Sequence, residues 1–175
     1  MNAKYSILAV LFSFIVTIGF AQEKSKKQLK EERKIEKQKQ IEAMVNAKEF
    51  VFIGNTALPS GYRSVNLTTN TNYVKFHPDL IDSYMPYYGT AYGGVGYGTG
   101  DTGLKFEGKP EEYTVTKGKK NYQVNAVVKA EHDTFRLSLS VGFEGSASLS
   151  IISNNRSSIS YNGEISAPEK KEEKK

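Results

Sequence analysis

The chain has 175 residues, of which 25% are charged, and a formal net charge of +5; this length has room for one domain with a substantial core. It contains no cysteine, which excludes a disulfide framework, a thiol nucleophile and a lipid attached to cysteine. Residues 22–48 hold nine basic and five acidic residues, whereas residues 49–167 hold ten basic and eleven acidic ones, so the central part is nearly neutral and we expect no nucleic-acid partner.

The first 21 residues have the pattern of a secretory signal peptide. Lys4 supplies a positive start, Ile7 to Ile18 form an apolar run, and the small-residue exit ends at Ala21. We predict cleavage between Ala21 and Gln22, and a location in the periplasm or outer envelope. The alternative is an uncleaved anchor, but this usually needs about 20 apolar residues, more than this run offers.

Residues 22–48 predict a charged helical leader, because they lack Gly and Pro and consist of strong helix formers. Only the second half can pack against a core, since Ile41, Met44, Val45 and Lys48 share one face. The first half fits a solvated spacer. Two alternatives for it are weak contact with an anionic surface and a coiled-coil partner, although heptads are not sustained.

After Lys48 the pattern changes to the alternation of β-strands. It starts at residues 49–53 and 72–77 and continues through several strands, each with one apolar and one polar face. The predicted apolar faces are Tyr122, Val124, Ala126 and Val128; Phe135, Leu137, Leu139, Val141 and Phe143; Ala147, Leu149 and Ile151; and Ile159, Tyr161 and Ile165.

Short turns separate these strands, which predicts an antiparallel meander. Because one face of every strand is apolar, the sheet must curl on itself or be covered by a second layer. We therefore predict an all-β domain over residues 49–167, either barrel-like or a sandwich. The helical segment Ile41 to Lys48 is suited to cover one end, and residues 168–175 are predicted to form a charged, disordered tail.

A Tyr- and Gly-rich insertion spans residues 84–103. Its Gly96, Gly98 and Gly100 superficially match a phosphate loop, but the flanking strand, helix and Lys-Ser/Thr of such a loop are missing. Exposed tyrosines on a loop suit contact with sugars or peptides, whereas the alternative is that the rings fold back over a barrel rim. The candidate contact residues are Tyr84, Tyr87, Tyr88, Tyr92 and Tyr97.

Few residues are candidates for catalysis. The two histidines each have an aspartate nearby, as the pairs His77 with Asp79 and His132 with Asp133, but turn positions explain both pairs more simply. No nucleophile elbow and no metal-ligand spacing is present. We expect no enzyme activity, no metal and no cofactor.

Several segments together resemble a known bacterial family. They are the leader, the Lys/Glu-rich helix ending near Phe50-Val-Phe-Ile, the segment Val65 to Phe76, the Gly-rich middle and the closing strands. They resemble the family named domain of unknown function 4251, over Gln38 to Ile165. The resemblance implies an exported protein of Gram-negative bacteria with a helix-plus-β layout and no assigned activity, and it transfers no functional residue.

The resulting expectation is a non-catalytic binding or structural module of the cell envelope. Its partner would be an envelope protein, a glycan or a small ligand. One alternative is a lipocalin-like carrier with an apolar ligand inside the barrel. A second is a small outer-membrane barrel, which the short strands and the charged tail disfavour.

Overall fold

The computed structural model describes residues 26–92, 103–131 and 133–168. The chain divides into two compact units, Met1–Ile35 and Glu36–Lys175. The boundary falls inside the helix, and the second unit contains the helix's C-terminal half and all the strands. The predicted signal peptide and its cleavage site at Ala21 and Gln22 lie outside the described residues.

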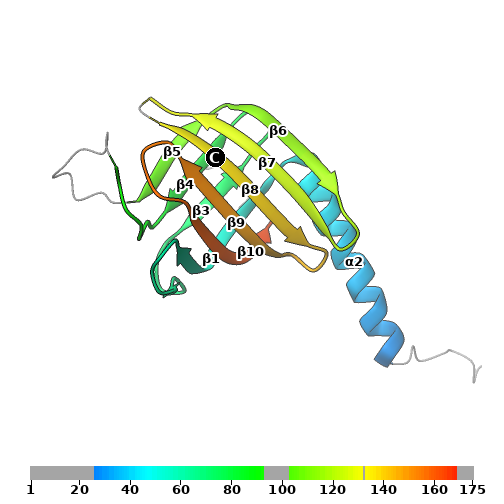
Figure 1. The fold of residues 1–175 in the computed structure, drawn as a ribbon. Coiled ribbons are helices and arrows are strands. Elements are labelled where there is room, and N and C mark those ends of the chain that lie inside the picture. Colours follow the sequence, from blue (N-terminus) through cyan, green and yellow to red (C-terminus); the bar gives the residue numbers. More distant parts are fainter. Residues whose placement is uncertain (1–25, 93–102, 132, 169–175) are drawn as a thin grey trace, which may run out of the picture. The chain divides into compact units, whose positions relative to one another are not determined.

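In the described ranges one helix precedes ten strands, and every strand pairing is antiparallel (Figure 1). This confirms the predicted all-β class with a preceding helix. The elements are α2 (Lys26–Ala47), β1 (Phe50–Pro59), β2 (Val65–Asn66), β3 (Tyr73–Phe76), β4 (Ile81–Met85), β5 (Leu104–Gly108), β6 (Pro110–Lys117), β7 (Asn121–Lys129), β8 (Thr134–Gly142), β9 (Ser146–Ser153) and β10 (Ile159–Ser166).

The strands form one sheet in the order β5-β4-β3-β1-β10-β9-β8-β7-β6, with β2 paired to β1 beside this path. Strands β6 to β10 are the predicted meander, because each pairs with the next along the chain. The first strand then pairs with the last: Val51 lies opposite Ser166, and Pro59 lies opposite Ile159. This pairing joins the meander to the run from β1 to β5.

The strand β1 contains a bulge at Asn55, because its register against β10 shifts between Gly54 and Thr56. Next to the bulge, between the residues of β1 that pair with β3 and those that pair with β2, the buried side chain of Asn72 takes the place of a neighbouring strand. The N–H of Gly54 donates to Asn72 Oδ1 at 2.7 Å, and Asn72 Nδ2 donates to the carbonyl of Gly54 at 3.0 Å. Both backbone groups of Gly54 are therefore paired, although neither β2 nor β3 reaches this residue.

The sheet curls into a nearly closed barrel, which decides between the barrel and the sandwich. Its two end strands, β5 and β6, follow each other in the chain with only Lys109 between them. Aromatic pairs span the seam that backbone hydrogen bonds leave open. Phe106 stacks on Phe135 with ring centroids 4.0 Å apart, and Phe76 contacts Tyr113 with centroids 6.2 Å apart.

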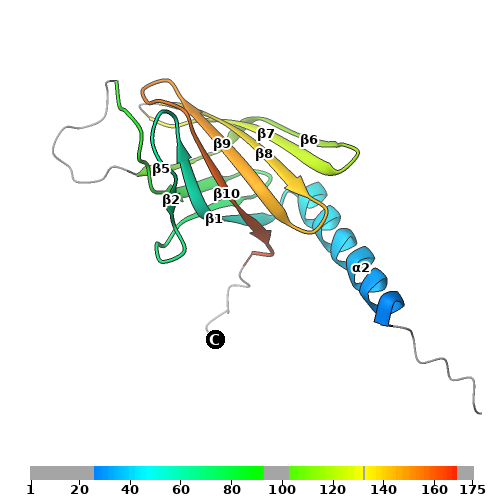
Figure 2. The same ribbon diagram turned by 60° about the horizontal axis from the view of Figure 1, so that its bottom comes forward.

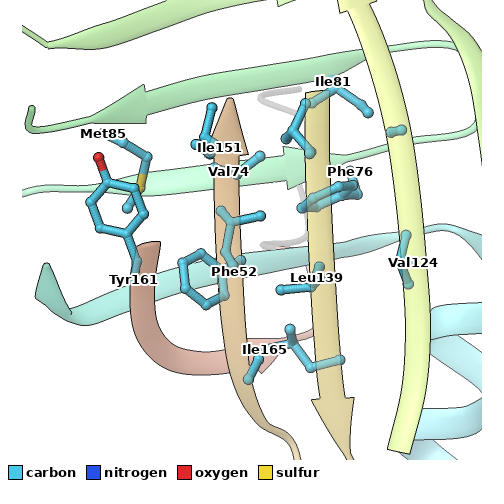
Figure 3. Packing of buried hydrophobic residues seen from close by; sticks show 14 of the residues in the cluster. Phe52, Val74, Phe76, Ile81, Met85, Val124, Leu139, Ile151, Tyr161 and Ile165 are labelled. Carbon is cyan, nitrogen blue, oxygen red and sulfur yellow. The ribbon is translucent and has the colours of Figure 1, made fainter. Parts of the chain in front are cut away.

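Large apolar side chains fill the interior of the sheet. Figure 3 shows side chains of β1, β3 and β4 meeting those of β7 to β10, with Phe52, Leu139 and Tyr161 among them. The predicted faces of β7 to β10 are buried, and Phe143 is partly buried. The period-two pattern therefore identified the inward side chains correctly.

The C-terminal half of α2 packs against the end of the barrel, as its apolar face predicted (Figure 2). Ile41 and Val45 are only 3% and 0% exposed. Beside them, Lys117 Nζ of β6 donates to Glu42 Oε1 at 2.6 Å, and this hydrogen bond lowers the pKa of Glu42.

The helix ends at Ala47, and the next residue, Lys48, lies in the left-handed backbone region with φ of 58°. The N–H groups of Lys48 and Glu49 donate to the carbonyls of Val45 and Met44, the two hydrogen bonds of a Schellman motif. Glycine is the usual residue there. Lys48 instead contributes its side chain, because its Nζ donates to the carbonyl of Tyr113 at 2.9 Å and lies 4.3 Å from that ring's centroid.

The side-chain amide of Asn72 should contribute strongly to the stability of the fold. We expect Asn72→Ala to lower the free energy of unfolding by about 2–4 kcal/mol, because it leaves both backbone groups of Gly54 buried and unpaired. The neighbouring Asn55 is exposed, so Asn55→Ala is the matched control and should change it by less than about 0.5 kcal/mol. Urea unfolding followed by circular dichroism measures both values; equal effects would contradict the role of Asn72.

Two isoleucines of the helix provide a matched test of its docking. Ile41 is 3% exposed and Ile35 is 50% exposed. We expect Ile41→Ala to lower the free energy of unfolding by about 2–4 kcal/mol through lost burial and a cavity, and Ile35→Ala by less than about 0.5 kcal/mol. The same urea titration measures both, and a small effect at Ile41 would show that the helix contributes little to the barrel's stability.

Candidate functional site

Residues 86–92, which follow β4 and which we call the rim segment, lie along the connection from β9 to β10. The N–H of Tyr92 donates to the carbonyl of Asn155 at 2.8 Å. The N–H of Ser157 donates to the carbonyl of Thr90, also at 2.8 Å. These bonds attach the start of the Tyr/Gly-rich insertion to the body of the barrel.

Tyr87 is the residue that anchors the rim segment, and it is only 8% exposed. Its hydroxyl lies 2.9 Å from the carbonyl of Thr90, 3.0 Å from that of Ser157 and 2.8 Å from Ser157 Oγ. The guanidinium of Arg156 covers the ring at 5.1 Å from its centroid. Of the candidate contact residues, Tyr87 thus folds back onto the rim, as the alternative reading of the insertion expects.

A second tyrosine forms a hydrogen bond to the backbone of the rim segment. Tyr161 of β10 is fully buried, and its hydroxyl donates to the carbonyl of Pro86 at 2.7 Å. Burial raises the pKa of Tyr161 far above its usual value. The phenol therefore stays protonated throughout the range of pH in which proteins work, and it keeps this hydrogen bond.

Three other tyrosines at this rim are exposed to solvent. Tyr88 is 37% exposed, Tyr92 is 71% exposed, and Tyr62 is 63% exposed. Tyr62 belongs to the turn after β1, and its hydroxyl lies 3.3 Å from Thr90 Oγ1 of the rim segment. We call Tyr62, Tyr88 and Tyr92 the tyrosine rim.

Sequence reasoning did not include Tyr62 among the candidates. A signal was available, because Tyr62 directly follows Gly61, whose φ of 80° marks a tight turn. An aromatic residue in such a turn is placed at the surface. Its proximity to residues 86–92, however, comes only from the folded chain.

Tyr84 lies on a different surface from the tyrosine rim. It belongs to β4, and its ring stacks on Tyr73 of β3 with centroids 5.9 Å apart. Lys105 Nζ lies 4.4 Å from the Tyr84 ring centroid, and Lys75 Nζ lies 4.3 Å from that of Tyr73. Lysines thus flank both rings in a cross-strand cluster. Tyr97 lies outside the described residues.

The candidate acid–base residues occupy turns. His77 and Leu80 exchange backbone hydrogen bonds, and Asp79 is 4.0 Å from Lys109. The second histidine, His132, is outside the described part of the chain.

The carboxylate of Asp133 joins two turns. It accepts hydrogen bonds from the N–H of Thr134 at 2.7 Å, from the N–H of Asn154 at 3.0 Å and from the hydroxyl of Ser153.

Among the residues in the described ranges, no three His, Cys, Asp or Glu side chains gather as a metal site would require. No helix of the described chain combines the length and apolar character needed to cross a membrane.

These features define a small helix-capped antiparallel β-barrel that carries three exposed tyrosines at one rim. The chain belongs to the family called Domain of unknown function (DUF4251), whose model matches residues 32–165. This confirms the resemblance drawn from the sequence. The fold is similar to that of a DUF4251 family protein from Bacteroides eggerthii, with a TM-score of 0.58 and 16% identity over 75% of this chain and 87% of that one. No curated protein matches this chain.

The anchoring role of Tyr87 can be tested by removing one oxygen atom. We expect Tyr87→Phe to speed hydrogen exchange at the amides of Tyr92 and Ser157 by roughly fivefold to tenfold, since one hydrogen bond contributes about 1 kcal/mol to local stability. Tyr88→Phe is the control and should leave both rates unchanged, because that ring is exposed. Amide exchange by NMR measures this. Unchanged rates in Tyr87→Phe would mean that the backbone bonds alone hold the segment.

Proposed function

We propose that this protein is an exported, non-catalytic binding module of the bacterial envelope, and that the tyrosine rim contacts its partner. The observation that carries the proposal is the contrast within the rim. Tyr87 and Tyr161 use their hydroxyls to hold the backbone in place, whereas Tyr62, Tyr88 and Tyr92 leave their rings in solvent.

Such an arrangement favours binding for an entropic reason. Tyrosine has a rigid ring and a hydroxyl that can both donate and accept, so it contributes contact area at low cost in conformational freedom. A segment already fixed to the barrel loses little more on binding. Exposed rings on a fixed rim therefore suit recognition better than rings on an unattached loop.

Export is proposed from the leader sequence. Its positive start, apolar run and small-residue exit at Ala21 are the pattern of a secretory signal. The absence of cysteine in the whole sequence agrees with a protein held by its core, without disulfides. Signal cleavage before Gln22 would leave the charged helix at the start of the mature chain.

The packed interior favours a surface contact over a carrier. Phe52, Leu139 and Tyr161 are each 0% exposed and meet inside the barrel, as do the stacked rings of Phe50 and Phe76 at 4.6 Å. A carrier of apolar ligands instead encloses a lined cavity of roughly 300–1,000 Å³. Side chains occupy the place where such a ligand would lie.

The test is cross-linking in whole cells of the source bacterium. We expect the native protein to capture a specific partner, and a protein with Tyr62→Ser, Tyr88→Ser and Tyr92→Ser to lose that capture while its melting temperature changes by only a few degrees, because exposed substitutions cost little stability. The control is Tyr84→Ser, which removes an exposed tyrosine from the separate cluster on β4 and should retain the partner.

Two outcomes would contradict the proposal. One is capture that persists in the triple variant. The other is an apolar metabolite that copurifies with the native protein and with the triple variant alike, as mass spectrometry would detect, because this result would favour the carrier.

A further inference from the structure

The outward face of the meander carries two cross-strand rows of small polar side chains. Each row contains one residue from each of the five strands β6 to β10, since directly paired residues share a face. The first row is Thr114, Asn125, Ser138, Ser150 and Ser160, and the second is Thr116, Gln123, Ser140, Ser148 and Asn162.

None of these ten side chains is charged, although a quarter of the whole chain is. The outward face of β3 to β5 shows that this is not a general property of the molecule. There, Lys75, Asp82, Lys105 and Glu107 face solvent beside the two stacked tyrosines. The two rows on β6 to β10 are therefore unusual within this protein, because they carry no charge and are rich in hydroxyl and amide groups. The charged residues of this face, Glu112, Arg136 and Glu164, lie beside the rows.

Hydrogen bonds hold part of this face in a defined arrangement. Gln123 Nε2 donates to Ser138 Oγ at 2.9 Å, and Ser138 Oγ donates to Asn125 Oδ1 at 2.9 Å. Asn121 Nδ2 donates to Ser140 Oγ at 2.7 Å. Side chains fixed in this way lose little freedom when a ligand binds.

The side chains of the two rows that lie on β9 and β10 retain their hydrogen-bonding capacity. Within the described chain, the four row members on β9 and β10 make no side-chain hydrogen bond to another residue. They can therefore donate to and accept from a ligand in place of water. These residues are Ser148, Ser150, Ser160 and Asn162.

A groove of about 230 Å³ lies between the first row and the row beside it. The row beside it is Glu112, Val127, Arg136 and Ile152, again one residue from each of β6 to β9. Ile152 is 47% exposed, which gives the groove an aliphatic wall. The opposite wall consists of Thr114, Asn125 and Ser138.

We propose that this groove and the two polar rows bind a neutral glycan chain that lies across the strands. A sugar ring presents C–H groups to an aliphatic wall and hydroxyls at its edge, which match Val127 and Ile152 on one side and the amide and hydroxyl groups on the other. The carboxylate of Glu112 can accept hydrogen bonds from two neighbouring sugar hydroxyls, and the guanidinium of Arg136 can donate hydrogen bonds to two.

The charge of the surface selects the class of ligand. Along the two rows, an anionic or cationic polymer would lose its hydration without meeting an opposite charge. In the groove, Glu112 and Arg136 supply one charge of each sign, so neither kind of polymer gains a net attraction there. A neutral glycan brings only hydroxyls, so each group that it desolvates can find a partner. This face is separate from the tyrosine rim, and glycan binding here does not depend on the function proposed for the rim.

The experiment is calorimetric titration of the full-length protein with four neutral hexasaccharides: α-1,4-glucan, β-1,4-glucan, β-1,4-mannan and β-1,4-xylan. The anionic hexamer of α-1,4-galacturonate is titrated in parallel. We expect at least one neutral hexasaccharide to bind and the anionic hexamer to bind at least about tenfold more weakly, a difference of about 1.4 kcal/mol.

Matched lysine substitutions locate the binding. Ser138→Lys places a charge in the groove and should weaken binding by about tenfold or more. Ser146→Lys makes the same change on the same outward face, beyond both rows, and should change the Kd by less than about twofold. Ile152→Lys is a second groove variant, in case Ser138→Lys lowers the melting temperature.

The results that would overturn the proposal differ from those that would overturn the function of the rim. Absence of binding by all four neutral hexasaccharides, equal binding of the anionic hexamer, or equal loss in the Ser138 and Ser146 variants would each contradict it. Loss of glycan binding in the triple variant of Tyr62, Tyr88 and Tyr92 would move the site to the rim and would also overturn it.

Discussion

The barrel depends on the pairing of its first strand with its last. Strand β1 hydrogen-bonds to β10 on one edge and to β2 and β3 on the other, so within the described chain it is the one strand whose pairing joins the two halves of the sheet. At Gly54, between its pairings with β3 and β2, this strand would have unpaired backbone groups, but Asn72 supplies both a donor and an acceptor there. A single buried amide therefore keeps the linking strand continuous where backbone pairing is interrupted.

Closure of the sheet is completed by side chains. The ladder ends at β5 and β6, and rings cross the remaining seam, as Phe106 does when it stacks on Phe135. The helix adds Ile41 and Val45 at the end of the barrel. Because aromatic and aliphatic side chains occupy the interior, the surfaces that remain for recognition are on the outside. They differ in chemistry: one is an aromatic rim, and the other is a sheet face with two rows of uncharged polar side chains.

The local pattern predicted much of the fold. Alternation along residues 122–165 identified the buried side of four strands, and the apolar face of Ile41, Met44 and Val45 identified the half of the helix that packs. The tyrosines were harder to interpret. Composition marked the insertion as a surface feature, but it did not separate Tyr87, which is buried, from Tyr88 and Tyr92, which are exposed. That difference depends on Ser157, 70 residues away.

The sequence by itself determined which side chains point inward, because strand periodicity is a property of neighbouring residues. It also determined the neutral charge of the β domain and the pattern of the leader. Only the tertiary structure decided between barrel and sandwich, brought Tyr62 beside Thr90, and aligned the polar residues of β6 to β10 in rows. These features depend on strand order and register, which pair residues far apart in the chain and are set by the closing of the whole sheet.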